Sequence, residues 1–415
     1  MTVHFNVQPY QGCMDVKIVY ERDEIKQESF YLNRDFVITH CLADEVQYDI
    51  SDGAQMTSLD EFDAYAVQKY FIPAFDKQLT LEYVGTLSGT TGCYPYVRET
   101  ISPEFTFIRW ETFCYPIFIS ESITPYQFLV GTSSIGITVS MPDEFIAVAC
   151  VPMTTWHVEN GVRTQGFFSD RNDIAIAIAG YVVEKLSIGT FYLLNEANSG
   201  QVEKSLTAAH GFMNEHFGVR DIPRDINYAA IPNQYGSFAS NTTVFVDEST
   251  FESAKTMHHM IHEFIHLGWN VKAEEETQKI RFFDEAFTSY FEMRVMEYLT
   301  KDNYRYRELM NGYQNQLNSF DGDVPIVEFG KHKYGDLSYT IGAVCLYKLS
   351  ELVGVELFED VTKKFLQKYR NIPVTMELFC NEYMQSCKNP ELEHFFDDWI
   401  YSVNGPKSFV ASYKE

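Results

Sequence analysis

The chain is poor in basic residues. Its 415 residues include 32 lysines and arginines against 58 aspartates and glutamates, which gives a formal net charge of −26. Because such an acidic surface repels phosphate groups, we expect neither nucleic acid nor an anionic membrane as a partner. The carboxylates are dispersed and form no long acidic run, a pattern typical of a solubilising surface.

Long apolar runs and ordered cysteine patterns are also missing. The longest apolar stretches, residues 145–152 and 174–183, are too short to span a bilayer. Residues 1–5 have neither the basic region nor the apolar core of a signal peptide. The eight cysteines are scattered and contain no C-x-x-C pair. We therefore expect a cytoplasmic protein with reduced thiols and no cysteine metal site.

No tandem repeat, low-complexity tract or proline-rich linker divides the chain. The chain is nevertheless longer than a domain with a single hydrophobic core usually is. Its content of 45% hydrophobic residues is sufficient for two such cores. Residues 1–187 consist mainly of β-branched and aromatic runs separated by turns, and only residues 59–70 have helical spacing. Residues 188–415 begin with short strands and continue as helices. We predict an α+β protein with domains at residues 1–187 and 188–415.

The individual elements follow from local patterns. The predicted strands include residues 16–20, 29–32, 79–84, 105–110, 135–139, 145–151, 174–180, 191–194 and 226–231. A helix is predicted over residues 201–217, with Gly218 as its C-terminal cap. Another is predicted over residues 392–401, and Gly405 and Pro406 are expected to end it.

Residues 257–266 carry the clearest chemical signal. They contain H-E-x-x-H, formed by His262, Glu263 and His266. Residues four apart lie on one face of a helix, so the two imidazoles would point to one site with a carboxylate beside them. That arrangement suits a catalytic zinc ion, which needs neutral nitrogen ligands and a base close to its water. Ser249 and Glu252 match a capping box that would begin this helix.

A catalytic zinc site normally has three protein ligands and an open fourth position. Eighteen residues separate His266 from Glu285, which begins a second stretch with helical spacing, where the positive end of the helix suits a carboxylate. Two antiparallel helices joined by a loop would bring it to the histidines. H-E-x-x-H alone also arises by chance on amphipathic helices. A purely structural zinc would need a fourth protein ligand, and none is evident.

Several neighbours are candidates for holding the ligands in place. Helix spacing singles out three residues near Glu285, namely Thr288, Ser289 and Glu292. His258 and His259 lie one turn before His262, where we expect them to pack or to support the ligands.

These residues together resemble the gluzincin aminopeptidases of the aminopeptidase N family. D-E-A-F-T-S-Y at residues 284–290 is similar to the family's N-E-G-F-A-x-Y, and residues 266–272 resemble the related glycyl aminopeptidases. The resemblance implies an N-terminal β-sandwich over residues 1–187 and a thermolysin-like, mainly helical catalytic domain over residues 188–415. It also implies a Zn²⁺ cofactor and a peptide substrate. The family's large helical C-terminal domain is expected to be missing.

The resemblance also suggests an oxyanion-stabilising tyrosine. Residues 339–346 are similar to the family's Y-x-K-G-A-x-x-L, which makes Tyr339 the catalytic tyrosine. Its phenol would donate a hydrogen bond to the oxyanion of a tetrahedral intermediate. Ile341 stands where the family has lysine, and Tyr334 is the alternative tyrosine.

A strand expected over residues 236–246 stands where the family has G-A-M-E-N and a substrate-binding edge strand. By this resemblance Gly236, Ser237, Phe238 and Ala239 would bind the substrate. The family's glutamate, which holds the free α-amino group, is replaced by Ala239, and a methyl group cannot pair with an ammonium. The alternative is an ordinary edge strand without a substrate role.

The resemblance implies zinc-dependent hydrolysis of peptide bonds. His262, His266 and Glu285 would hold zinc, Glu263 would act as general base and Tyr339 would stabilise the oxyanion. Two alternatives stay open. One is a hydrolase that acts on a non-peptide or N-blocked substrate. The other is a non-catalytic binding protein that has kept its zinc, against which the intact Glu263 argues.

Overall fold

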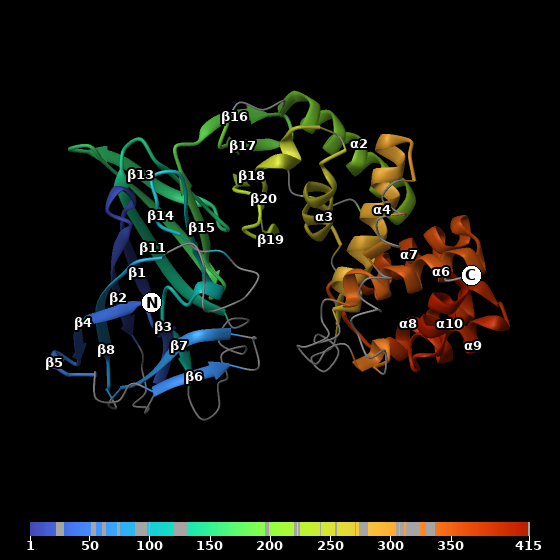
Figure 1. Ribbon diagram of the computed structural model, residues 1–415, viewed down its shortest axis with the longest axis horizontal. Coiled ribbons are helices and arrows are strands. Elements are labelled where there is room, and N and C mark those ends of the chain that lie inside the picture. Colours follow the sequence, from blue (N-terminus) through green and yellow to red (C-terminus); the bar gives the residue numbers. More distant parts are fainter. Residues whose placement is uncertain are drawn as a thin grey trace. The chain divides into compact units, whose positions relative to one another are not determined.

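A computed structural model of the 415-residue chain combines β-sheets with helices (Figure 1), as expected of an α+β protein. It describes residues 1–21, 29–50, 55–59, 64–72, 75–87, 98, 100–119, 132–195, 199–219, 222, 225–240, 242–253, 255–269, 271–273, 281–303, 307, 311–312, 324–328 and 337–413. The chain forms two compact units. The first comprises Met1–Ala197 and Asp225–Glu248, and the second comprises Asn198–Arg224 and Ser249–Glu415.

The largest sheet of the first unit has eight strands in the order β13-β14-β11-β1-β2-β8-β4-β5. Only β1 and β11 run parallel; the other neighbours are antiparallel. β1 alternates exposed and buried residues because one face of the sheet meets the apolar core. The strands are β1 Thr2–Gln8, β2 Cys13–Glu21, β4 Phe36–Ala43, β5 Val46–Gln47, β8 Gln78–Gly85, β11 Thr132–Pro142, β13 Met153–Glu159 and β14 Val162–Arg171.

Two smaller sheets complete the N-terminal β structure. One has the order β10-β3-β7-β6, with β3 Ser29–Asn33, β6 Gln55–Leu59, β7 Ala64–Phe71 and β10 Ile117–Ile119. The other has the order β12-β15-β9, with β9 Thr106–Arg109, β12 Ile146–Ala149 and β15 Ala175–Ala179. The β-sandwich arrangement of these sheets stays a prediction.

The helical spacing noted over residues 59–70 does not correspond to a helix in the described part of that stretch. β7 occupies most of that stretch and pairs with β3, so that Tyr70 lies opposite Phe30 with ring centroids 5.2 Å apart. The valine, tyrosines and phenylalanine of β7 favour a pleated surface, and pairing with a wholly buried strand outweighs the weak helical spacing.

A five-stranded sheet with the order β16-β17-β18-β20-β19 also belongs to the first unit. Its strands are β16 Val182–Leu186, β17 Gly189–Leu193, β18 Ile226–Ile231, β19 Phe238–Ser240 and β20 Thr243–Asp247. The single edge strand expected over residues 236–246 is therefore two antiparallel strands. Val244 and Val246 are fully buried, which suits the inner strand β20, whereas the residues of β19 are half-buried at the edge.

The compact units do not follow the predicted division between residues 187 and 188. The five-stranded sheet lies with residues 1–197, although most of it comes after residue 188 in sequence. The boundary between the two predicted domains therefore stays a prediction.

The second unit is mainly helical. Its helices are α2 Ser199–Phe217, α3 His258–His266, α4 Phe287–Thr300, α6 Ile341–Val353, α7 Val355–Tyr369, α8 Met376–Cys387, α9 Glu391–Trp399 and α10 Asn404–Tyr413. A π-helical turn, η7 Phe282–Ala286, precedes α4, and the short strands β21 Lys272–Ala273 and β22 Pro373–Val374 pair in parallel. Among the described helices, none is both long and apolar enough to cross a membrane.

Two predicted helix boundaries in this unit are wrong. α3 begins at His258 without a side-chain cap, because Ser249 belongs to the 3₁₀ turn η5 Glu248–Phe251 and Glu252 follows it; the expected capping box does not begin α3. Gly405 and Pro406 do not end α9. They lie in the first turn of α10, where proline is tolerated because the first N–H groups have no helical partner.

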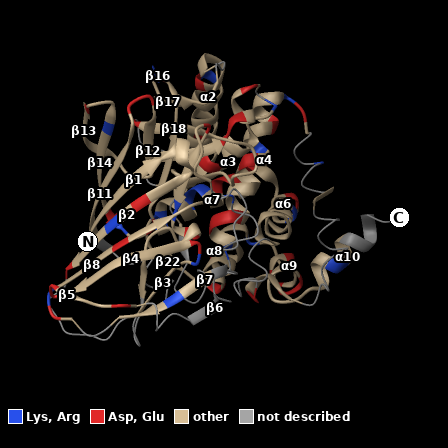
Figure 2. Cartoon of the chain, turned by 60° about the vertical axis from the view of Figure 1, so that its left-hand side comes forward, with Lys and Arg blue, Asp and Glu red and all other residues tan. Residues whose placement is uncertain are grey.

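Aspartates and glutamates are spread over strands and helices rather than gathered on one element (Figure 2), as the dispersed acidic residues of the sequence indicate. The seven cysteines among the described residues are free thiols.

Candidate metal centre

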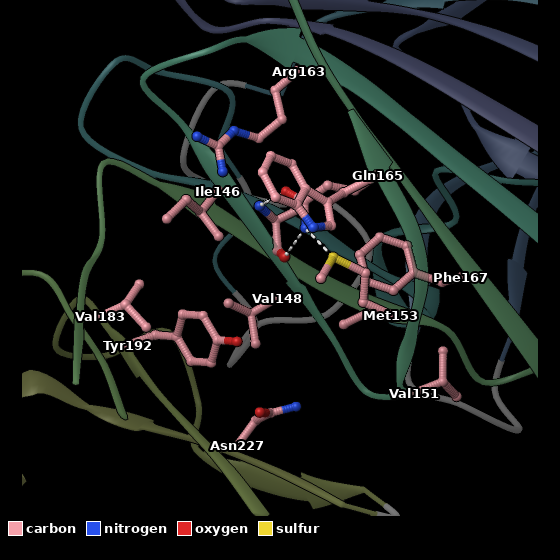
Figure 3. A pocket seen from close by; sticks show the side chains of 13 residues that line it. Ile146, Val148, Val151, Met153, Arg163, Gln165, Phe167, Val183, Tyr192 and Asn227 are labelled. Atoms are coloured by element: carbon pink, nitrogen blue, oxygen red, sulfur yellow. Dashed lines mark hydrogen bonds between the residues drawn. The ribbon is translucent and has the colours of Figure 1, made fainter. Parts of the chain in front are cut away.

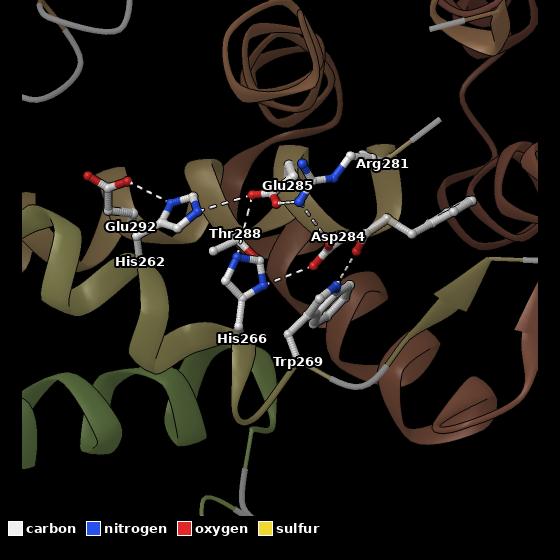
Figure 4. Close-up of polar contacts among 9 residues, drawn as sticks. His262, His266, Trp269, Arg281, Asp284, Glu285, Thr288 and Glu292 are labelled. Atoms are coloured by element: carbon white, nitrogen blue, oxygen red, sulfur yellow. Dashed lines mark hydrogen bonds and ion pairs between the residues drawn. The ribbon is translucent and has the colours of Figure 1, made fainter. Parts of the chain in front are cut away.

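Helix α3 places the two histidines of the H-E-x-x-H motif on one face. Met260, Ile261 and Ile265 are fully buried and fix the helix in the core of the second unit. One helical turn separates His262 and His266, whose ring centroids are 4.9 Å apart. Both imidazoles lie on the side of α3 that faces Glu285 (Figure 4).

Glu285 comes from the π-helical turn η7. Arg281 precedes this turn in a left-handed conformation, with φ of 49°, and its carbonyl accepts a hydrogen bond from the Glu285 N–H at 2.7 Å. The Trp269 indole donates to the Phe283 carbonyl at 2.5 Å, which supports the same turn from the segment after α3. π-Helical turns are rare and frequently lie at functional sites.

The three predicted ligands converge. Glu285 Oε2 lies 3.1 Å from His262 Nε2 and 3.4 Å from His266 Nε2. One ligand atom of each residue lies within 4.8 Å of the others, and this is the one such group among the described residues. Ligand atoms of a tetrahedral zinc with bonds of about 2.0–2.1 Å are roughly 3.3 Å apart. The donor set and its spacing therefore fit zinc.

The Nδ1 atoms of both histidines face carboxylates. His262 Nδ1 lies 3.0 Å from Glu292 Oε2, and His266 Nδ1 lies 2.9 Å from Asp284 Oδ1 (Figure 4). Thr288 Oγ1 also approaches His266 Nδ1, at 3.4 Å. Such partners fix the ring orientation and leave Nε2 for a metal.

Of the three residues that helix spacing singled out, two contact the histidines: Glu292 and Thr288. Ser289 is buried on α4. His258 Nδ1 lies 3.9 Å from Glu292 Oε1, so it borders the same carboxylate. Asp284 was missed, although its place directly before Glu285 was a usable signal.

Arg281 is a second residue that the sequence reading missed. Its guanidinium contacts the other oxygen of Glu285, Oε1, and lies over the Tyr339 ring at 5.6 Å from the centroid. The same residue therefore holds both the backbone and the side chain of Glu285. Its four-residue spacing from Glu285 was a usable signal for this ion pair, although the left-handed backbone of Arg281 was not.

Electrostatics keep the carboxylate ligand ionised. Burial alone would raise the pKa of Glu285, but Arg281 and the two histidines hold it well below its usual range. Burial lowers the pKa of His262, yet hydrogen bonds with Glu285 and Glu292 outweigh it and raise the pKa to about 9. A metal ion that binds His262 would therefore displace a proton from it.

Glu263 lies beside the ligands on α3 and is itself buried. Burial raises the pKa of its carboxyl, and the neighbouring histidines counteract that rise. A buried carboxylate with a raised pKa is suited to accepting a proton near neutral pH.

Tyr339 lies at the same centre. It lies two residues before the start of α6, and its ring stacks on His262 with centroids 5.7 Å apart and an interplanar angle of 22°. Burial, followed by the negative charge of Glu285, raises its pKa well above the usual value. The phenol therefore stays protonated and can donate a hydrogen bond. The alternative, Tyr334, lies outside the described residues.

Close packing of η7 and α6 brings Tyr339 to the ligands. A Cβ atom added at Gly342 would lie 2.6 Å from the Ala286 side chain. Only glycine at this position allows the first turn of α6 to approach η7 so closely. The predicted residues His262, Glu263, His266, Glu285 and Tyr339 are thus brought together within the second unit.

The predicted substrate-binding residues lie in the first unit. Gly236 has a φ of +77°, Ser237 accepts a hydrogen bond from the Asp247 N–H at 3.2 Å, and Phe238 and Ala239 begin β19. Ala239 lies opposite Val244 of β20. Of the described strands, none pairs with the outer edge of β19.

The first unit also contains an apolar pocket of about 180 Å³ (Figure 3). Gln165 closes one wall by bonding the backbone N–H and carbonyl of Ala147 at 2.8 and 2.9 Å. The described residues that line the pocket include no histidine, cysteine or carboxylate, so it offers no hydrolytic chemistry.

Neither the scan against protein-family models nor the search of the curated proteins finds a match. Solved structures are similar. An M1 zinc metallopeptidase mutant from Deinococcus radiodurans, bound to a Tyr-Ser-Ala substrate, is 14% identical with a TM-score of 0.60, over 96% of this chain and 92% of that one. An aminopeptidase N family protein from Idiomarina loihiensis is 13% identical with a TM-score of 0.69, over 97% and 76%.

A two-domain M1 zinc metallopeptidase mutant bound to L-tryptophan is also similar. It is 14% identical with a TM-score of 0.59, and the likeness covers 96% of this chain and 93% of that one. At such identities a structural likeness establishes architecture rather than activity. The chain therefore has the fold of the M1 zinc metallopeptidases and aminopeptidase N family proteins.

Proposed function

We propose that the protein is a zinc-dependent peptidase with its reaction centre in the second unit. The observation that carries the proposal is the convergence of His262 Nε2, His266 Nε2 and Glu285 Oε2, with Glu263 on the same helix. Two imidazoles and one carboxylate leave a tetrahedral ion one open position, as hydrolysis requires. When bound, zinc supplies a Lewis acid that polarises a carbonyl and makes water more acidic.

Glu263 serves as the general base. Its carboxylate takes a proton from the attacking water and later gives it to the amine that leaves. Burial beside the ligands supports this role, because a raised pKa brings the carboxyl closer to the pH at which both transfers occur. Glu263 accepts and returns one proton per turnover, so it is unchanged at the end.

Tyr339 serves as the oxyanion donor. Its stacking on His262 supports a place beside the scissile carbonyl, and its raised pKa supports a protonated phenol. A hydrogen bond to the developing negative oxygen stabilises the transition state more than the substrate, so it accelerates the reaction.

Strand β19 serves as the substrate strand. An extended peptide can add to an exposed sheet edge through backbone hydrogen bonds, and β19 is such an edge. Gly236, Ser237, Phe238 and Ala239 would provide the binding segment. The Deinococcus radiodurans neighbour, which shares the fold, was crystallised with a tripeptide, and this supports a peptide as the substrate.

Two variants test the function. Glu263→Gln should retain zinc and lose nearly all turnover, since this residue is a base and not a ligand. Glu285→Ala should lose most of its zinc, because only two protein ligands remain. Metal analysis and turnover of a mixed peptide panel are the measurements, with Glu393→Gln on the exposed face of α9 as the control.

The same panel separates the competing functions. A wild type that holds zinc but cleaves no peptide would overturn the proposal in favour of a non-peptide hydrolase or a zinc-holding binding protein. Equal loss of zinc and turnover in Glu263→Gln would contradict the role given to that residue.

A further inference from the structure

A buried ion pair lies in the first unit. Arg109, the last residue of β9, donates from Nε and Nη2 to the two oxygens of Glu111 at 3.1 and 2.5 Å. The side chains are only 5% and 10% exposed. Removing two charges from water is unfavourable, and such a pair is often no more stabilising than apolar residues would be. Stability alone therefore does not explain why this ion pair is buried here.

The rest of the guanidinium holds the turn that leads into β19. Arg109 Nη1 donates to the carbonyl oxygens of Tyr235 and Gly236, each at 3.0 Å. Its central carbon lies over the Phe238 ring, 4.4 Å from the centroid. Glu111 orients the planar group from the opposite side, so one arginine connects β9 to Tyr235, Gly236 and Phe238.

The turn is built to accept this arginine. Gly236 has a left-handed φ of +77°, which favours glycine, and an added Cβ would lie 3.4 Å from Arg109 Nη1. On its other side, the Asp247 N–H donates to Ser237 Oγ. The segment is thus held both from β9 and from β20.

Strand β19 needs such support. It has three residues, and only Phe238, Ala239 and Ser240 pair with β20. Short edge strands with half-buried side chains are poorly ordered by pairing alone. A substrate that adds to a disordered edge must also order it, and that cost weakens binding.

We propose that Arg109, oriented by Glu111, is a positioning residue that keeps β19 ordered for pairing with the substrate backbone. This inference rests on the proposed function, in which β19 binds the peptide. Backbone pairing is present in the bound substrate and in the transition state alike. Its loss therefore raises KM and leaves kcat almost unchanged.

The test compares Arg109→Met with Arg171→Met. Arg171 makes a similar pair with the acid two residues on, Asp173, but its side chain is 46% exposed, so it is a matched control. In Arg109→Met we expect KM for a pentapeptide to rise about tenfold or more, with kcat within about threefold and zinc content unchanged. KM for a dipeptide, which pairs with less of the strand, should rise less.

A second measurement does not depend on activity. Amide hydrogen exchange at residues 238–240 without substrate should be faster in Arg109→Met than in wild type, while β18 stays protected. If Arg109→Met does not fold, Gly236→Ala strains the same turn without leaving Glu111 unpaired, and the same rise in KM is expected.

The outcomes are distinct. If Arg109→Met lowers both the stability and kcat but leaves KM unchanged, the ion pair has a purely structural role and the inference is overturned. Faster exchange with unchanged KM would overturn it too, and would leave the proposed peptidase function standing. A wild type that cleaves none of the peptides would overturn the proposed function, and the positioning role with it.

Discussion

At the residue scale, the geometry of the candidate centre depends on the side chains that contact its three predicted ligands. Glu292 and Asp284 face the Nδ1 atoms of His262 and His266, so with a metal bound each ring would keep its proton on Nδ1 and bind through Nε2. Arg281 in turn occupies the outer oxygen of Glu285. Each ligand therefore has one atom for the metal and one held by the protein.

Glu292→Gln tests this support. The amide cannot accept the Nδ1 proton with the strength of a carboxylate, so zinc affinity should fall about 10–100-fold. Competition with a chelator measures the affinity, and Glu297→Gln on the same helix is the control. Unchanged zinc affinity in Glu292→Gln would remove the carboxylate from the metal site.

Tyr339→Phe tests the oxyanion donor. Loss of one such donor typically lowers kcat by roughly a hundredfold or more, while zinc content should not change. Steady-state kinetics on one good peptide measures the effect, with the exposed Tyr298→Phe as the control. A Tyr339→Phe enzyme as fast as wild type would transfer the role to Tyr334 or to no tyrosine.

The sequence could predict the ligands but not all of their partners. H-E-x-x-H and the eighteen-residue spacing to Glu285 depend on residue identity and helix period, which are local. Asp284 contacts His266 and Arg281 contacts Glu285, because a left-handed residue and a π-helical turn present these two side chains to the centre.

At the element scale, sequence periodicity predicted those helices and strands whose formation depends on local sequence. Strands such as β2 and helices such as α2 match their patterns, and Gly218 follows α2 with φ of +72°. The hairpin of β19 and β20 was read as one strand because both halves are β-favouring. What distinguishes them is their place in the sheet: β20 pairs with β18 on one side and β19 on the other, whereas β19 pairs with β20 alone among the described strands.

Gly342→Ala tests the packing of η7 against α6. The added methyl would lie 2.6 Å from Ala286, so the two elements must move apart, which should destabilise the protein by about 1–3 kcal/mol. Because Tyr339 precedes α6, kcat should fall as well. Thermal unfolding and steady-state kinetics on the same preparation measure the two effects.

The control for this change is Gly211→Ala. Gly211 is also inside a helix, α2, but nothing lies within 4 Å of the added Cβ. That variant should gain about 0.5–1 kcal/mol from the higher helix propensity of alanine. If Gly342→Ala were equally stabilising, close packing would not be what places Tyr339.

At the scale of the whole molecule, the proposed chemistry and the proposed substrate strand belong to different units. His262, Glu263, His266, Glu285 and Tyr339 lie in the second, and β19 with its Arg109 support lies in the first. Substrate preference can therefore change in one unit while the reaction centre in the other is preserved. Ala239 is the position where such a change is expected.

Recognition of a free amino terminus requires an acid, because a desolvated ammonium is costly unless it is paired. Ala239 stands where the aminopeptidase N family has its glutamate. Glu111 cannot easily replace it, since both of its oxygens are bonded to Arg109. Glu121, an acid that could also supply this carboxylate, lies outside the described residues.

We therefore expect N-terminally acetylated peptides to be cleaved at least as fast as the matched free peptides. Ala239→Glu restores a carboxylate at this position and should shift the preference towards free amines, with zinc content unchanged. Rates on paired free and acetylated peptides, for wild type and Ala239→Glu, are the measurement. A wild type that strongly prefers the free amine would mean that a different carboxylate binds it, and that the replacement at Ala239 does not set the specificity.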